Sequence, residues 1–146
     1  MAKAAYPEWM VRLLGWAHGA ALRLSGGRIG RFVLGMEAVE LHTTGRRTRR
    51  ERTALLTAPI QEEGRIVLVA SLGGGDHHPA WYLNLRANPG VRITGAAGTR
   101  RYRARTATGD ERAALWERAV EVYPNYAHYQ ECTDRVIPVV VCEPVD

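Results

Sequence analysis

Six short runs of β-type sequence lie between Met36 and Pro144, and this pattern constrains the fold more than any other feature of the chain. Glycine, proline or charged residues separate the runs, and each run has the length of one strand. The links between the first three are short, which predicts an antiparallel meander. The runs are Val39–Thr44, Thr53–Ile60, Arg65–Ala70, Val91–Thr94, Thr99–Thr106 and Ile137–Cys142.

Helical features are confined to three segments outside these runs. Pro7–Leu24 carries apolar residues at helical spacing and is followed by a glycine pair. Pro79–Asn88 reads as a short helix that stops at a Pro-Gly pair. Thr108–Glu111 fits a capping box at the start of a helix that runs to Pro124. Segregated helices and about six mainly antiparallel strands predict an α+β fold built on a sheet or barrel.

The length of 146 residues suits one domain, with an N-terminal helix and cap at residues 1–27 and a strand core at residues 36–144. The two cysteines have no zinc-site spacing and are expected to be reduced thiols. No apolar run has the length of a membrane span, so we expect a cytoplasmic protein. The amphipathic first helix is expected to pack on the domain, although its basic flank leaves peripheral membrane contact open.

The 20 basic residues outnumber the 15 acidic ones, and Lys3 is the single lysine among them. Arginine is suited to phosphate and carboxylate groups, so the balance suggests an anionic partner. A phosphorylated small molecule, a membrane surface and nucleic acid all satisfy that description. We do not expect nucleic acid to be the partner, because the chain contains no helix-turn-helix pattern, ribonucleoprotein strand motif or zinc finger.

The first candidate site is an arginine-rich turn between the first two strand runs. It contains Gly45, Arg46, Arg47 and Thr48, with Arg52 at the start of the next strand. Backbone amides at a glycine turn, a hydroxyl and arginine side chains form a good phosphate cradle. The alternative interpretation is a solvated β-turn that carries charge.

A second candidate is the glycine-rich segment from Ser71 to Trp81, between a buried strand and a helix. Its glycines allow another group to approach the backbone closely. The segment matches neither a Walker A loop nor the dinucleotide fingerprint, so by itself it indicates little. The five histidines of the chain have no ligand spacing, and we assign no metal.

The third candidate comprises Tyr123, Tyr126 and Tyr129, three residues apart, with Pro124 expected to break or restart the helix there. The spacing fits core packing and the wall of a ligand pocket equally. No Ser/His/Asp arrangement or cysteine nucleophile stands out. An enzyme with this sequence would therefore rely on a cofactor for its difficult chemistry.

Three segments taken together, LHTTGRRTRRER, ASLGGGDHHPAWYLNLRANP and YPNYAHYQECTDRVIPVVVCEP, resemble the deazaflavin-dependent nitroreductase family of actinobacteria. The resemblance covers Ser25 to Pro144. It implies a split β-barrel of the FMN-binding type that binds coenzyme F420 and forms a homodimer. It also implies hydride transfer from the reduced coenzyme to a quinone, an activated alkene (enone) or a nitro compound. A protein with this barrel that binds FMN or haem in a carrier or other redox role is the alternative.

The resemblance also assigns roles to individual positions. The arginine-rich turn would hold the phosphate and acidic tail of the coenzyme, and the glycine segment with the following helix would lie beside it. The cofactor-binding positions are Gly45, Arg46, Arg47, Thr48, Arg52, Ser71, Gly73, Gly74, Pro79, Trp81, Tyr82 and Asn84. Two positions depart from the family pattern: Leu72 stands in place of a lysine and Arg49 in place of a glycine.

The three tyrosines would border the substrate pocket, and we predict that one of them supplies the proton that accompanies the hydride. Tyr126 is the first choice because it is central in the series, and Tyr129 is the second. In the alternative, Tyr123, Tyr126 and Tyr129 only shape an apolar wall.

Overall fold

The computed structural model describes residues 9–10, 12, 32–33 and 36–145. Trp9, Met10 and Arg12 are helical. The rest of the helix expected at Pro7–Leu24, and with it the question of membrane contact, lies outside the described residues. Within the described part, no helix is long and apolar enough to cross a membrane.

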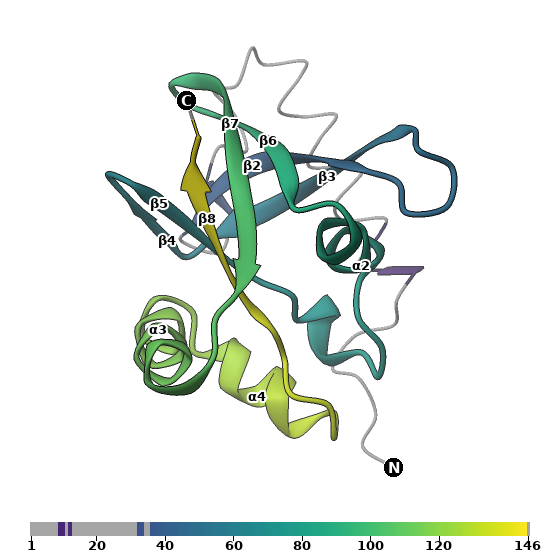
Figure 1. The fold of residues 1–146 in the computed structure, drawn as a ribbon. Coiled ribbons are helices and arrows are strands. Elements are labelled where there is room, and N and C mark those ends of the chain that lie inside the picture. The colour runs from purple at the N-terminus through teal and green to yellow at the C-terminus, as the bar shows by residue number, and fades with distance from the viewer. Residues whose placement is uncertain (1–8, 11, 13–31, 34–35, 146) are drawn as a thin grey trace.

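One curled antiparallel sheet dominates the described part of the chain (Figure 1). The strand order is β1-β2-β6-β7-β8-β5-β4, and β3 pairs with β2 outside this path. The strands are β1 (Phe32–Val33), β2 (Met36–Thr44), β3 (Glu51–Ala58), β4 (Ile60–Glu62), β5 (Arg65–Val69), β6 (Gly90–Gly95), β7 (Gly98–Thr106) and β8 (Val139–Pro144). The helices are the short 3-10 helix η1 (Leu72–Gly74), α2 (Ala80–Ala87), α3 (Gly109–Val122) and α4 (Asn125–Glu131).

All six predicted strand runs are strands in the structure, and the α+β prediction is confirmed. The meander differs in one respect. β3 pairs with β2 as expected, but the hairpin with β5 is formed by the separate strand β4, where Ile60 pairs with Val67. Pro59 lies between β3 and β4. Proline has no N–H to donate to a strand ladder, which explains why the strand is interrupted there.

The two apolar strands β5 and β8 lie side by side and are covered on both faces. Leu68 and Val140 point into the barrel, where they join the largest core cluster. Val139 and Val141, which alternate with Val140, join another cluster that includes Leu115 of α3. A strand buried on both faces needs apolar residues at successive positions, which explains the continuous apolar sequence of this segment.

The start of α3 differs from the sequence-based prediction. Thr108 precedes the helix in an extended conformation, but its side chain makes no capping hydrogen bond. Glu111 instead accepts two bonds from the Arg105 guanidinium, at 2.5 and 3.0 Å. Hydrogen bonds between two charged groups are stronger than a neutral cap, so the expected capping box does not form.

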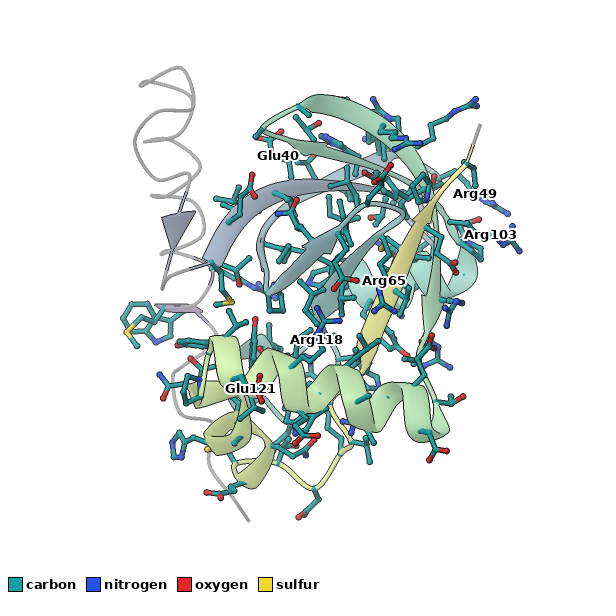
Figure 2. All side chains as sticks on the ribbon, turned by 90° about the vertical axis from the view of Figure 1, so that its left-hand side faces the viewer. Glu40, Arg49, Arg65, Arg103, Arg118 and Glu121 are labelled. Carbon is teal, nitrogen blue, oxygen red and sulfur yellow. The ribbon has the colours of Figure 1, made fainter. Side chains whose placement is uncertain are left out.

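Charged side chains also join α3 to the β4–β5 hairpin. Glu62 of β4 accepts hydrogen bonds from Arg65 of β5, at 2.9 Å, and from Arg118 of α3. Both arginines hold the pKa of the Glu62 carboxyl below its usual range. Figure 2 shows Arg65 and Arg118 on the same side of the molecule. This pairing anchors α3 on the side of the sheet away from the arginine-rich turn.

Candidate functional site

Asn84 of α2 connects the arginine-rich turn to the rest of the molecule. Its Oδ1 accepts hydrogen bonds from the backbone N–H and from Nη1 of Arg46, both at 3.1 Å. Its Nδ2 donates to Oγ1 of Thr43 at 3.4 Å. Asn84 and Thr43 are both buried, so their polar atoms need these partners. Two predicted motifs about 40 residues apart are therefore joined by a buried amide.

The turn between β2 and β3 has a tight backbone. The Gly45 N–H donates to the Arg50 carbonyl at 2.8 Å, and the Arg49 N–H donates to the Gly45 carbonyl at 2.9 Å. A Cβ at Gly45 would lie 2.8 Å from Thr48 Oγ1, so a larger residue does not fit. Arg49 has a φ of 62°, a conformation that favours glycine and explains the glycine of the family pattern at this position. Its guanidinium donates to Asn88 Oδ1 of the segment after α2, at 3.3 Å.

The turn carries positive charge that the described residues do not neutralise. Within the described ranges, the side chains of Arg47 and Arg50 make no hydrogen bond or ion pair, and Arg52 bonds only to Thr48, at 3.5 Å. The single carboxylate of the turn, Glu51, is engaged by Arg92 of β6. In Figure 2, Arg49 extends outward at the edge of the molecule, as does Arg103 of β7. This donor set fits the phosphate and carboxylate groups of an anionic coenzyme.

The glycine segment after β5 folds into three consecutive residues with positive φ. Leu72, Gly73 and Gly74 have φ values of 48°, 58° and 83°. A Cβ at Gly74 would lie 3.0 Å from the Cβ of Cys132 and 3.1 Å from the Tyr129 carbonyl oxygen. The group that approaches this glycine closely is therefore α4 and the residue after it. Figure 1 shows the turn and α4 beside one another below the sheet.

Arg135, a residue that the sequence analysis missed, binds this turn from the loop between α4 and β8. Its guanidinium donates to the carbonyl oxygens of Gly75 at 2.8 Å, Ser71 at 2.9 Å and Ala70 at 3.2 and 3.3 Å. It also lies 3.2 Å from Nδ1 of His78. These partners are mostly backbone carbonyls some 60 residues earlier in the chain, so no motif or spacing indicates them.

The site residues predicted at the start of α2 and within it differ in burial. Pro79, Tyr82 and Asn84 are buried, whereas Trp81 is half-buried. The Tyr82 hydroxyl lies 2.9 Å from Oγ1 of Thr106, and its ring packs against His78 with centroids 4.9 Å apart. Tyr82 therefore anchors α2 to β7.

The three tyrosines form one cluster. Tyr123 follows α3 in an extended conformation, and Pro124 precedes α4, so the helix breaks where the sequence predicted. The hydroxyls of Tyr123 and Tyr129 lie 3.0 Å apart, and Asn125 Nδ2 donates to the Tyr123 hydroxyl at 3.1 Å. The Tyr126 hydroxyl is directed elsewhere, to Sδ of Met36 at 3.5 Å. Burial raises the pKa of Tyr126 to about 12.

The second predicted motif thus contacts each of the other two in the structure. Asn84 of α2 binds the arginine-rich turn, and Gly74 of the glycine segment lies against Tyr129 of the tyrosine cluster. The described residues include no group of three or more histidine, cysteine or acidic side chains placed to hold a metal ion. Binding of anions by arginine and hydrogen bonding by tyrosine are what this arrangement can supply.

Comparison with known proteins supports the family resemblance that the sequence motifs indicated. Residues 16–144 match the family described as F420H(2)-dependent quinone reductase. An F420H(2)-dependent quinone reductase of Mycobacterium tuberculosis is 37% identical over 144 residues, which cover 92% of this chain and 95% of that protein. The solved structure of an F420-H2 dependent reductase is 41% identical, with a TM-score of 0.66, and covers 73% of this chain and 93% of the other.

A second solved structure, described as a domain-swapped dimer, is 38% identical with a TM-score of 0.69 and covers 88% of this chain and 97% of the other. A haem storage protein of Vibrio cholerae is similar in fold alone, at 14% identity and a TM-score of 0.55, with 75% of this chain and 82% of that one covered. The split β-barrel prediction is confirmed, and so is coenzyme F420, which the family name specifies. The chain belongs to the F420H(2)-dependent quinone reductase family.

Proposed function

We propose that this protein transfers a hydride from reduced coenzyme F420 to a quinone. The observation that carries the proposal is the buried amide of Asn84, which holds the arginine-rich turn against α2. This contact joins two of the segments that carry the family resemblance. It also holds in place the turn from which the arginine side chains extend. The family assignment supports the same reaction.

In this proposal, the coenzyme's phosphate and acidic tail bind at the arginine-rich turn. Arg47 and Arg52 donate to the anionic oxygens, and Gly45, Arg46 and Thr48 hold the turn in shape. Arg50 would supply a further cation at the arginine-rich turn, in compensation for the family lysine that Leu72 replaces elsewhere in the chain. Ser71, Gly73, Gly74, Pro79 and Trp81 lie along the ring system, while Tyr82 and Asn84 orient α2. When bound, the coenzyme supplies the hydride.

The tyrosine cluster would bind the acceptor and stabilise the negative charge that develops on its oxygen. The geometry favours the Tyr123–Tyr129 pair for this role over Tyr126, the choice made from the sequence. The paired hydroxyls already share a hydrogen bond, and Tyr123 is partly exposed to solvent. Tyr126 is buried and its hydroxyl is engaged by Met36, so it would first have to leave that contact.

Enones and nitro compounds are further acceptors that we propose for the same site, because both accept a hydride with development of negative charge on oxygen or carbon. We also propose a homodimer in the cytoplasm. The dimeric assembly described for a 38% identical structure supports the homodimer.

The proposal is tested by titrating the full chain with oxidised coenzyme F420, FMN and haem in parallel. We expect coenzyme F420 to bind more tightly than either alternative. Oxidation of the reduced coenzyme is then followed with a quinone, an enone and a nitroaromatic compound as acceptors. Preferential binding of FMN or haem would contradict the proposed coenzyme, whereas turnover limited to enones or nitro compounds would contradict the proposed acceptor.

A further inference from the structure

One guanidinium closes the glycine-rich turn between β5 and α2. Arg135 donates to the carbonyl oxygens of Ala70 and Ser71, which precede η1, and to that of Gly75, which follows it. It also reaches His78 Nδ1 beyond the turn. Because the donors of a guanidinium are fixed in one plane, these bonds determine the separation of the two ends of the turn.

The same bonds determine which way the peptide units of the turn face. In a trans peptide the N–H and the C=O point in opposite directions, and the described residues contain no cis peptide. The carbonyls of Ser71 and Gly75 face Arg135, so the N–H groups of Leu72 and Asp76 face away from it. Arg135 therefore directs amide donors of the turn toward the side opposite the guanidinium.

The turn has a conformation that needs such support. Leu72 is not a glycine, yet it has a φ of 48°. A residue of this kind keeps a left-handed conformation only where its surroundings impose it. Arg135 binds the carbonyl of the residue before Leu72 and that of Gly75, three residues after it. Since arginine has no acceptor, the contact with His78 requires a neutral imidazole whose Nδ1 accepts.

We propose that Arg135 is a positioning residue, which holds the turn of residues 70–78 in the conformation that receives the coenzyme. This inference rests on the proposed function, in which the turn lies along the ring system. Arg135 acts through the backbone of the turn. Its removal should loosen the turn in the free protein and weaken coenzyme binding, while the sheet stays intact.

The experiment compares Arg135→Ala and Arg135→Lys with wild type and with a matched control, Arg112→Ala. Arg112 is also partly buried. It donates to the carbonyl oxygen of Ile137 at 2.9 Å, in the loop between α4 and β8 that contains Arg135, but it has no hydrogen bond to the glycine-rich turn. Amide hydrogen exchange is measured on the free proteins, and coenzyme F420 is titrated by fluorescence. The exchange measurement is independent of catalysis and of the coenzyme.

In Arg135→Ala, amides of residues 71–77 should exchange about tenfold faster or more, with β2 and β7 unchanged, and coenzyme affinity should fall by about tenfold. Arg135→Lys should be intermediate, because one ammonium cannot bridge both ends of the turn. If Arg135→Ala does not fold, the comparison of Arg135→Lys with wild type tests the proposal. Arg112→Ala should leave the turn as in wild type.

The inference is overturned if the turn exchanges normally in the Arg135 variants, if coenzyme affinity stays within about twofold of wild type, or if Arg112→Ala has the same effect. Failure of the wild-type protein to bind coenzyme F420 is a different result. It would contradict the proposed function and the coenzyme part of this inference, while hydrogen exchange would still report whether Arg135 braces the turn.

Discussion

Asn84 of α2 uses both the oxygen and the nitrogen of its amide to bind β2 and the turn that follows it. Its replacement is therefore expected to affect both stability and coenzyme binding. Replacement by alanine would leave the backbone N–H of Arg46 without its partner and the hydroxyl of Thr43 with only its 3.5 Å bond to the Arg52 carbonyl. We expect Asn84→Ala to lower the free energy of unfolding by about 1–3 kcal/mol and to weaken coenzyme binding. Chemical denaturation and a coenzyme titration measure the two effects.

Asn88→Ala is the matched control, since Asn88 follows the same helix and binds Arg49 near the surface. We expect it to change the free energy of unfolding by less than about 0.5 kcal/mol. Equal effects of the two substitutions would mean that the Asn84 bridge has no special role.

Arg47 and Arg52, which form no ion pair among the described residues, give a second prediction. Arg47→Ala and Arg52→Ala should each weaken coenzyme binding by about tenfold, because each removes a charge-assisted hydrogen bond to an anionic oxygen. The loss should shrink at high salt, which screens exposed charges. Titrations at two ionic strengths measure this. Arg118→Ala on α3 removes the same charge far from the turn and should leave the affinity unchanged; normal binding by both turn variants would place the coenzyme elsewhere.

The tyrosine hydroxyls can be separated by substitution with phenylalanine, which keeps the ring. Tyr129→Phe breaks the hydroxyl pair and should lower turnover by about ten- to a thousandfold with coenzyme affinity unchanged. Tyr126→Phe leaves that pair in place, removes the bond to Met36 and should have a smaller effect. Steady-state rates with several quinones decide between them. A larger loss in Tyr126→Phe would restore the first choice made from the sequence, and full activity in both variants would make the cluster an apolar wall.

At the scale of elements, the glycine turn and α4 are packed so closely that Gly74 has no room for a side chain. Gly74→Val combines this clash with a positive φ and should destabilise the fold by about 2–4 kcal/mol, with loss of coenzyme binding. Gly64→Val is the control. Gly64 also has a positive φ, of 88°, but nothing lies within 4 Å of its Cβ position.

Gly64→Val should therefore show the cost of the backbone conformation alone, about 1–3 kcal/mol, and bind the coenzyme normally. Thermal unfolding and coenzyme titration of both variants give the comparison. If Gly74→Val were no less stable than Gly64→Val, the close contact with α4 would carry no energetic weight.

The elements themselves were largely predictable from the sequence, because each has a local pattern. The apolar run of β8 and the break at Pro124 follow from the order of residues alone. The capping box at Thr108 was not formed, because Glu111 has a stronger partner in Arg105, whose position depends on the tertiary fold. The strand order, in which β8 lies between β7 and β5, joins segments that no local pattern relates.

The candidate site divides in the same way. Family motifs identified Asn84 as a site residue, but its bond to Arg46 could be seen only in the folded chain. Arg135 was missed altogether, since a side chain that binds distant backbone carbonyls leaves no sequence pattern. The glycines of the second segment indicated a close approach to the backbone, but nothing in the sequence indicated that α4 is the element that lies against Gly74.

At the scale of the whole molecule, the sheet supports all three predicted segments, and ion pairs such as Glu62–Arg118 fix α3 to the β4–β5 hairpin (Figures 1 and 2). The formal net charge of +5 is concentrated in part in the arginine-rich turn. A positive region of this kind attracts an anionic coenzyme over a distance. The sheet therefore serves as the rigid support, and the turns that it holds provide the chemistry.

The most direct test of this account is the rate at which the wild-type protein oxidises reduced coenzyme F420 with a quinone under anaerobic conditions. The account predicts a rate that depends on the quinone, saturates with coenzyme and falls by about a hundredfold at low coenzyme in the Arg47→Ala/Arg52→Ala double variant. Arg118→Ala should retain the wild-type rate. A folded wild-type protein that oxidises the reduced coenzyme no faster than a protein-free control with any quinone would contradict the account.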